Sequence, residues 1–83
     1  MRNNKEKAIL VQVGSILLKR RLEMNLPRTK LALILGVDEK QIRRVENGEV
    51  NTSILTLYKM CIALNLDITF LSEIDVDETI IDY

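Results

Sequence analysis

Residues 27–48 read PRTKLALILGVDEKQIRRVENG, and this stretch decides the fold. Its apolar residues recur at helical spacing in two short runs, one on each side of a Gly-Val-Asp turn at 36–38. Gly36 and Gly48 can each end a helix in the left-handed conformation, and Asp38 can cap the start of the second helix. The stretch therefore predicts two short helices joined by a tight turn.

The segments on both sides of this stretch also have a helical period. Apolar residues between Asn4 and Met24 recur at mostly helical intervals, which predicts a first helix that Asn3 or Asn4 can cap. Proline suits a first helical turn, so Pro27 marks the start of the next helix. A fourth helix is predicted from three competent caps followed by four apolar residues on one face: Asn51, Thr52 and Ser53, then Ile54, Leu57, Cys61 and Leu64.

A second apolar line on the fourth helix has two interpretations. Leu55, Tyr58 and Ile62 can be core residues, or they can contact a second subunit. A helix that is apolar on two sides needs two coverings, and the domain core supplies only one. We therefore name these three residues as candidates for a dimer interface.

The residues after Asn65 change period. Leu66, Ile68 and Phe70 alternate with other positions, which favours a short strand. Because a single strand is not stable alone, it would pair with the same strand of a second subunit. The alternative is a fifth helix or an extended arm, and Ile68 and Phe70 are candidates for either the dimer interface or the core. The sequence thus predicts an all-α bundle of four to five helices with an optional C-terminal strand.

Composition limits the chain to one small domain and argues against an enzyme. A chain of 83 residues makes one domain at most. We expect residues 1–66 to form it and residues 67–83 to be a strand or arm with an acidic tail. The absence of His and the single cysteine, Cys61, remove the usual zinc and iron ligand sets and every nucleophile–histidine pair. We expect no enzyme, metal or cofactor, and a buried thiol at Cys61.

The chain has no segment suited to a membrane. Its longest uncharged run, 8–18, has 11 residues, whereas a helix that crosses a bilayer needs about 20. No small-residue cleavage site follows the run, so it does not resemble a signal peptide. We expect a cytoplasmic protein with no membrane partner.

The formal net charge of zero conceals an uneven distribution. Residues 1–65 carry all 12 Lys and Arg and six of the 12 acidic residues, and the rest of the chain carries the other six acids. A basic body with an acidic tail is expected of a nucleic-acid binder whose tail solvates, pairs with a partner or repels misplaced DNA. A solvated tail without function is the alternative.

The second of the two short helices carries basic residues on its outer side. Lys40, Arg43 and Arg44 point away from the predicted core, and Gln41 lies beside them. Such side chains donate to guanine edges or neutralise phosphates. In a helix-turn-helix, the second helix enters the major groove while the first crosses the backbone. We therefore predict double-stranded DNA as the partner, with a solvated helix face as the alternative.

At these residues the segment Leu26–Leu66 resembles the Cro/repressor-type helix-turn-helix family, often called XRE. The resemblance implies a lambda-repressor-like bundle and a homodimer on a palindromic operator, with the third helix as the reader. It is carried by Arg21, Leu31, Ala32, Gly36, Val37, Ile42, Glu46, Asn47, Gly48, Ser53, Leu57, Lys59, Ala63 and Leu64.

The resemblance also implies roles for individual residues. A largely buried pair between Arg21 and Glu46 would join the first helix to the reader. Arg28 and the backbone near Asn47 would contact phosphates, since helix amino termini favour anions. The full set of implied DNA contacts is Arg28, Asp38, Glu39, Lys40, Gln41, Arg43, Arg44 and Asn47.

The chain departs from the family pattern at both helix starts. Pro27 and Arg28 stand where the family commonly has Thr or Ser followed by Gln, and Asp38 stands where it often has Ser. Asp38 and Glu39 would repel phosphate, unless they accept hydrogen bonds from cytosine amino groups. In the other interpretation, Asp38 is a cap and Glu39 pairs with Arg43 four residues on.

These features support three hypotheses of function. The first is a transcriptional regulator, a repressor, that occupies its operator as a homodimer. The second is an antitoxin, because Asn51–Ser53 followed by a helix and then Leu66–Phe70 resembles the HipB-type antitoxins; residues 71–83 would mask a toxin partner. The third is a helical module for protein contact, which leaves the outward cations without a purpose.

Overall fold

The computed structural model describes residues 4–75 of the chain, and every element of regular secondary structure in this range is a helix. Four α-helices are followed by one 3-10 helix: α1 (Asn4–Glu23), α2 (Arg28–Leu35), α3 (Glu39–Glu46), α4 (Ile54–Ala63) and η1 (Ile68–Glu73). The predicted all-α bundle with a helix-turn-helix is confirmed. The expected cap at Asn3 and the tail beyond Asp75 lie outside the described residues.

Local chemistry sets most of the helix ends. The Asp38 carboxylate accepts a hydrogen bond from the Lys40 backbone at 2.8 Å, and the Ser53 hydroxyl accepts one from the Thr56 backbone at 3.1 Å. Both side chains therefore cap the first turn of their helices, as expected of Asp and Ser. Gly36 ends α2 at a φ of 72°, a left-handed conformation that costs glycine little.

The predicted C-terminal strand is wrong, and the fifth helix is correct. Asp67 caps this segment, because its carboxylate accepts from the Thr69 backbone at 2.9 Å, while the Phe70 N–H donates to the Asp67 carbonyl at 3.0 Å. A capped turn satisfies backbone groups locally, whereas a strand needs a neighbouring edge, and residues 4–75 contain no other strand.

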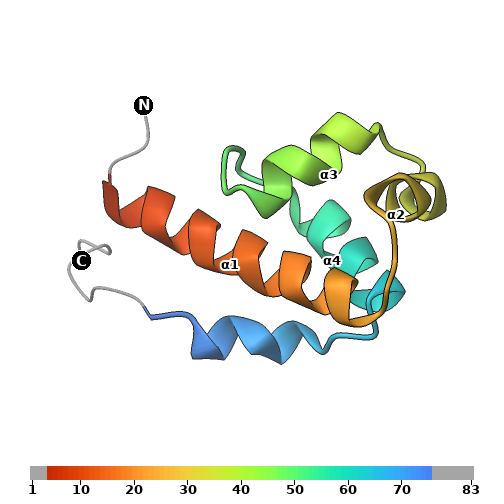
Figure 1. Cartoon of the computed structure of the whole chain (residues 1–83). Helices are drawn as coiled ribbons and strands as arrows, with labels where there is room; N and C mark the ends of the chain where they lie inside the picture. Colours follow the sequence, from red (N-terminus) through yellow and green to blue (C-terminus); the bar gives the residue numbers. More distant parts are fainter. Residues whose placement is uncertain (1–3, 76–83) are drawn as a thin grey trace.

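Figure 1 shows α3 lying across the upper side of α1, with α2 beside it and η1 running below α1. Two sets of hydrogen bonds fix the antiparallel path of η1 along α1. Arg20 Nε donates to the Leu64 carbonyl at 2.8 Å near one end of the segment. At the other end, the Gln12 side-chain amide both donates to and accepts from the Asp75 backbone, at 2.9 Å in each case.

One core joins all these elements. Its fully buried side chains come from each of the four α-helices and the residue after α4: Leu17, Leu31, Ile42, Met60 and Leu64. Phe70 of η1 is buried in the same core, although it lies beyond the expected domain boundary at residue 66. Gly14 lets α1 approach α3 closely, because a Cβ atom there would lie 2.3 Å from the Val45 carbonyl oxygen.

Candidate nucleic-acid interface

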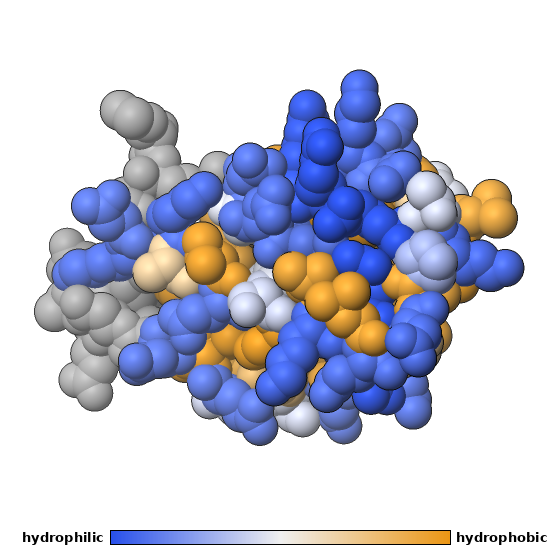
Figure 2. All heavy atoms as spheres, in the orientation of Figure 1, coloured by the Kyte–Doolittle hydropathy of each residue, from blue (hydrophilic) through white to orange (hydrophobic). Residues whose placement is uncertain are grey.

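The outer face of α3 gathers the predicted DNA-contact residues. Lys40, Arg43, Arg44 and Asn47 are all exposed and follow the i, i+3, i+4, i+7 spacing that puts residues on one side of a helix. Hydrophilic side chains accordingly cover the upper side of the molecule, where α3 lies (Figure 2). The opposite face of the helix is buried through Ile42, Val45 and Glu46. Gln41 lies between the two faces and is half-buried.

The two acidic residues at the start of α3 have different surroundings. Asp38 is the cap of the helix, as one of its two interpretations predicted. Glu39 is exposed and, with Lys40 and Arg43, lines a shallow hollow at this end of the helix. The same interpretation also expected Glu39 to pair with Arg43, and this part is wrong, because no ion pair joins them within residues 4–75. Glu39 therefore offers a carboxylate to whatever lies against α3.

Beneath this face lies the buried pair that the resemblance implied. Arg21 Nε donates to Glu46 Oε2 at 2.6 Å, and Arg21 Nη2 donates to Glu46 Oε1 at 3.3 Å. Arg21 Nη1 donates to the Leu26 carbonyl at 2.8 Å. The Glu46 side chain is completely buried, so the pair locks α1 to the end of α3. Removing Glu46 would leave the buried Arg21 guanidinium without its carboxylate.

Two further contacts at this site were missed by the sequence analysis. Arg28, which is expected to contact a phosphate, also donates from Nε to the buried carboxylate of Glu46, at 3.0 Å to Oε1. Lys7 Nζ donates to the Gly48 carbonyl at 3.1 Å, which brings a cation of α1 to the end of α3. Neither pairing had a signal in the sequence, because the partners are far apart in the chain and only the fold brings them together.

The start of α2 lacks a side-chain cap. Pro27 occupies the cap position and makes no side-chain hydrogen bond to the helix. The free N–H groups of a first turn carry a partial positive charge, which favours an anion such as a phosphate. Arg28 begins this helix, so its side chain and the helix end attract the same kind of group.

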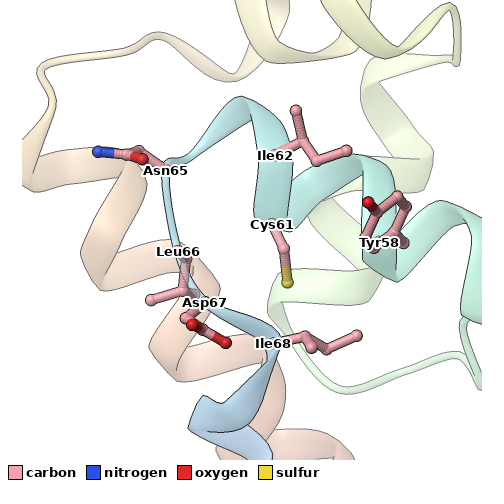
Figure 3. Close-up of a pocket in the computed structure, with 7 residues that line it drawn as sticks. All are labelled: Tyr58, Cys61, Ile62, Asn65, Leu66, Asp67 and Ile68. Atoms are coloured by element: carbon pink, nitrogen blue, oxygen red, sulfur yellow. The ribbon is translucent and has the colours of Figure 1, made fainter.

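A second surface, on α4, is apolar. Leu55, Tyr58 and Ile62 are 60%, 53% and 63% exposed, and Ile68 is half-buried beside them. Tyr58 and Ile62 of α4 and Ile68 at the start of η1 border an open groove of about 530 Å³ (Figure 3). Phe70 is different, since it is only 6% exposed and belongs to the core, the alternative that the sequence left open for it.

Cys61 lies at the floor of this groove as a buried free thiol. Burial, and secondarily the negative charge of Asp67, raise the pKa of the Cys61 thiol above its usual value. Backbone and side-chain hydrogen bonds from Thr69 lower the pKa of the Asp67 carboxyl. The thiol is therefore protonated at neutral pH and packs as a small apolar group.

Over residues 4–75, no helix combines the length and the apolar character needed to cross a membrane. The same residues contain no group of three or more His, Cys, Asp or Glu side chains placed to hold a metal ion.

Comparisons with known proteins agree with this geometry. A family model described as "Helix-turn-helix" matches residues 17–71. The "ImmF control region 10 kDa protein" of Bacillus phage phi105 is 33% identical over 69 residues, which are 81% of this chain and 77% of that protein. The crystal structure of the restriction-modification controller protein C.AhdI from Aeromonas hydrophila superposes with a TM-score of 0.75 at 29% identity, covering 82% of this chain and 99% of that one. This chain belongs to the XRE-type helix-turn-helix family of DNA-binding transcriptional regulators.

Proposed function

We propose that the protein is a sequence-specific regulator that binds a palindromic operator as a homodimer and acts by occupying DNA, not by catalysis. One observation carries the proposal: α3 presents Lys40, Arg43 and Arg44 on a single exposed face while its other face is fixed in the core. A rigid helix with outward cations fits the major groove and can donate to guanine edges and phosphates. The expected sign of regulation is repression, because a protein on an operator excludes other proteins from it.

The proposed homodimer uses the apolar surface of α4. An exposed apolar line of this kind is unusual on a monomer, and burial of Leu55, Tyr58 and Ile62 by a second copy removes it from water. Two-fold symmetry would place two copies of α3 about 34 Å apart, one helical turn of DNA. The protein would therefore read two half-sites in opposite orientation.

The relatives support a regulatory role of this kind. By their names, one belongs to the control region of a phage and the other is a controller of a restriction-modification system. We infer the same class of role for this chain, with an operator of its own.

Selection of bound duplexes from a random pool tests the proposal. We expect the full chain to enrich a motif with two-fold symmetry and half-site centres about 34 Å apart. Affinity for that motif should fall as salt rises, because binding releases counterions from the phosphates. The Arg44→Ala variant should lose most of the binding, whereas Lys19→Ala, on the face of α1 that carries Gln12, should retain it. A pool without enrichment, or equal binding by Arg44→Ala, would overturn the proposal.

The antitoxin alternative is not proposed. The resemblance behind it depended on a strand at Leu66–Phe70, and the structure has the 3-10 helix η1 there. Most of the segment expected to mask a toxin lies outside the described residues. Neither of the relatives above is named as an antitoxin.

A further inference from the structure

Glu46 binds two arginines whose head groups are used very differently. Its side chain is completely buried, whereas the side chains of Arg21 and Arg28 are 7% and 29% exposed. Arg21 directs Nε and both Nη atoms to protein acceptors, namely Glu46 and the Leu26 carbonyl. Arg28 uses only Nε, which donates to Glu46 at 3.0 Å. The protein therefore binds the Arg21 head group through all three of its nitrogen atoms and that of Arg28 through Nε alone.

The remaining donors of Arg28 have no partner within the described protein. All of them are on Nη1 and Nη2, because the guanidinium has one N–H on Nε and the others on these two atoms. Arg28 is half-buried. If its Nη atoms were buried, they would be buried polar atoms without a partner, and neither atom is one of these. Both Nη atoms therefore reach solvent. They are free to bind an outside group.

The charge of the cluster also calls for an outside anion. One carboxylate compensates two guanidinium groups, so a formal charge of +1 remains, and the arginine open to solvent is the one that carries it. Arg28 begins α2, next to the end of the helix that carries Arg43 and Arg44. Because Arg28 reaches Glu46, an anion bound by Arg28 would lie near the end of α3.

We propose that Glu46 is a positioning residue for DNA binding: it holds the Nε edge of Arg28 so that the two Nη atoms form a fork for one backbone phosphate. This inference rests on the proposed function and adds a defined contact to it. A fork held in advance loses little side-chain entropy on binding, and two parallel N–H donors match a phosphate better than a point charge does. Glu46 therefore has two roles: it pairs with Arg21 in the core, and it orients Arg28 for a contact with a DNA phosphate.

Replacing Arg28 with lysine separates geometry from charge. Arg28→Lys keeps the positive charge but has no Nε–H for Glu46 and no fork, so we expect about a tenfold loss of affinity for the selected duplex, with little change in its salt dependence. Arg28→Gln should lose at least as much and should also reduce the salt slope by about 1. The control is Lys19→Gln, which removes one positive charge from α1 and should change neither quantity. Fluorescence anisotropy across a salt series measures both.

A double-mutant cycle tests the part played by Glu46. In the Glu46→Gln background we expect Arg28→Gln to weaken binding less than about threefold, because the neutral amide has one acceptor oxygen for two arginines and no longer holds Arg28 by a charge-assisted hydrogen bond. Losses that simply multiply would overturn the positioning role, since a Glu46 that only stabilises the fold has no reason to change the effect of Arg28. Thermal unfolding of each variant identifies the fraction folded at the binding temperature.

If Glu46→Gln does not fold, the affinity of Arg28→Lys alone tests whether Arg28 binds a phosphate through its fork. Affinity equal to that of the unmodified protein would mean that Arg28 is only a surface charge, and the inference would be wrong. If the unmodified protein itself enriches no duplex from the random pool, the proposed function fails first. The two failures are therefore distinct.

Discussion

Single residues at the start of α3 decide how this helix begins. The carboxylate of Asp38 accepts from the Lys40 backbone and so satisfies one N–H of the first turn that has no partner within the helix. The same carboxylate, together with that of Glu39, places negative charge at the end of a surface that carries Lys40, Arg43 and Arg44. The cap is useful for folding and unfavourable for phosphate binding, and two substitutions can separate these effects.

We expect Asp38→Asn to leave the free energy of unfolding nearly unchanged, because Asn caps helices about as well as Asp. Asp38→Ala should lower it by about 1 kcal/mol, the usual cost of losing a cap. Urea unfolding followed by circular dichroism measures both. The Asn variant should also bind duplex DNA at least as tightly as the unmodified protein, since it removes a charge that repels phosphate. Weaker binding by Asp38→Asn would instead assign the carboxylate to a cytosine amino group.

At the scale of helices, the contact between α1 and α3 fixes how far the exposed face of α3 stands from α1. Gly14 provides that contact, because a Cβ atom there would lie 2.3 Å from the Val45 carbonyl and 2.5 Å from the Glu46 carbonyl. Both obstacles are backbone atoms of α3 and cannot rotate away. A larger residue must push the helices apart, and Glu46 would then move with respect to Arg21.

We therefore expect Gly14→Ala to destabilise the protein by about 1–3 kcal/mol, the usual cost of overpacking, although alanine favours a helix more than glycine does. DNA binding should weaken as well, because α3 shifts. Ser15→Ala is the control: it changes an exposed residue of the same helix and should have little effect. Urea denaturation measures the difference, and a Gly14→Ala variant that is more stable than the unmodified chain would contradict the close packing.

Particular elements show how far sequence reasoning reaches at this scale. α2 and α3 were predicted from caps, glycines and periodicity, which act within a few residues. η1 was ambiguous because its apolar residues are too few to distinguish a period of two from a turn, and only the cap at Asp67 and the burial of Phe70 decide it. The link between Arg28 and Glu46 had no local signal, since it exists only once α2 packs against α3.

The whole molecule has two surfaces with different chemistry. α3 presents cations, while α4 and the start of η1 present an apolar groove bordered by Tyr58, Ile62 and Ile68. The first is the surface proposed to meet DNA, and the second is the surface proposed to be covered by a second copy of the chain. A substitution on the second surface should therefore change DNA recognition without touching the first, and this separates the proposed dimer from the proposed reader.

We expect Ile62→Lys to convert a dimer into a monomer, measured as a halved mass in light scattering after size-exclusion chromatography. A lysine side chain brought into an apolar interface is costly to desolvate, even though the Asp67 carboxylate borders the same groove. The fold should persist, because Ile62 is 63% exposed within one chain. A monomer has one α3, so it should bind a single half-site and lose the preference for two-fold sites. Leu22→Lys, which changes an exposed apolar residue of α1, should leave mass and recognition intact. An unmodified chain that is already monomeric, or an Ile62→Lys variant that remains dimeric, would rule out this face as the interface.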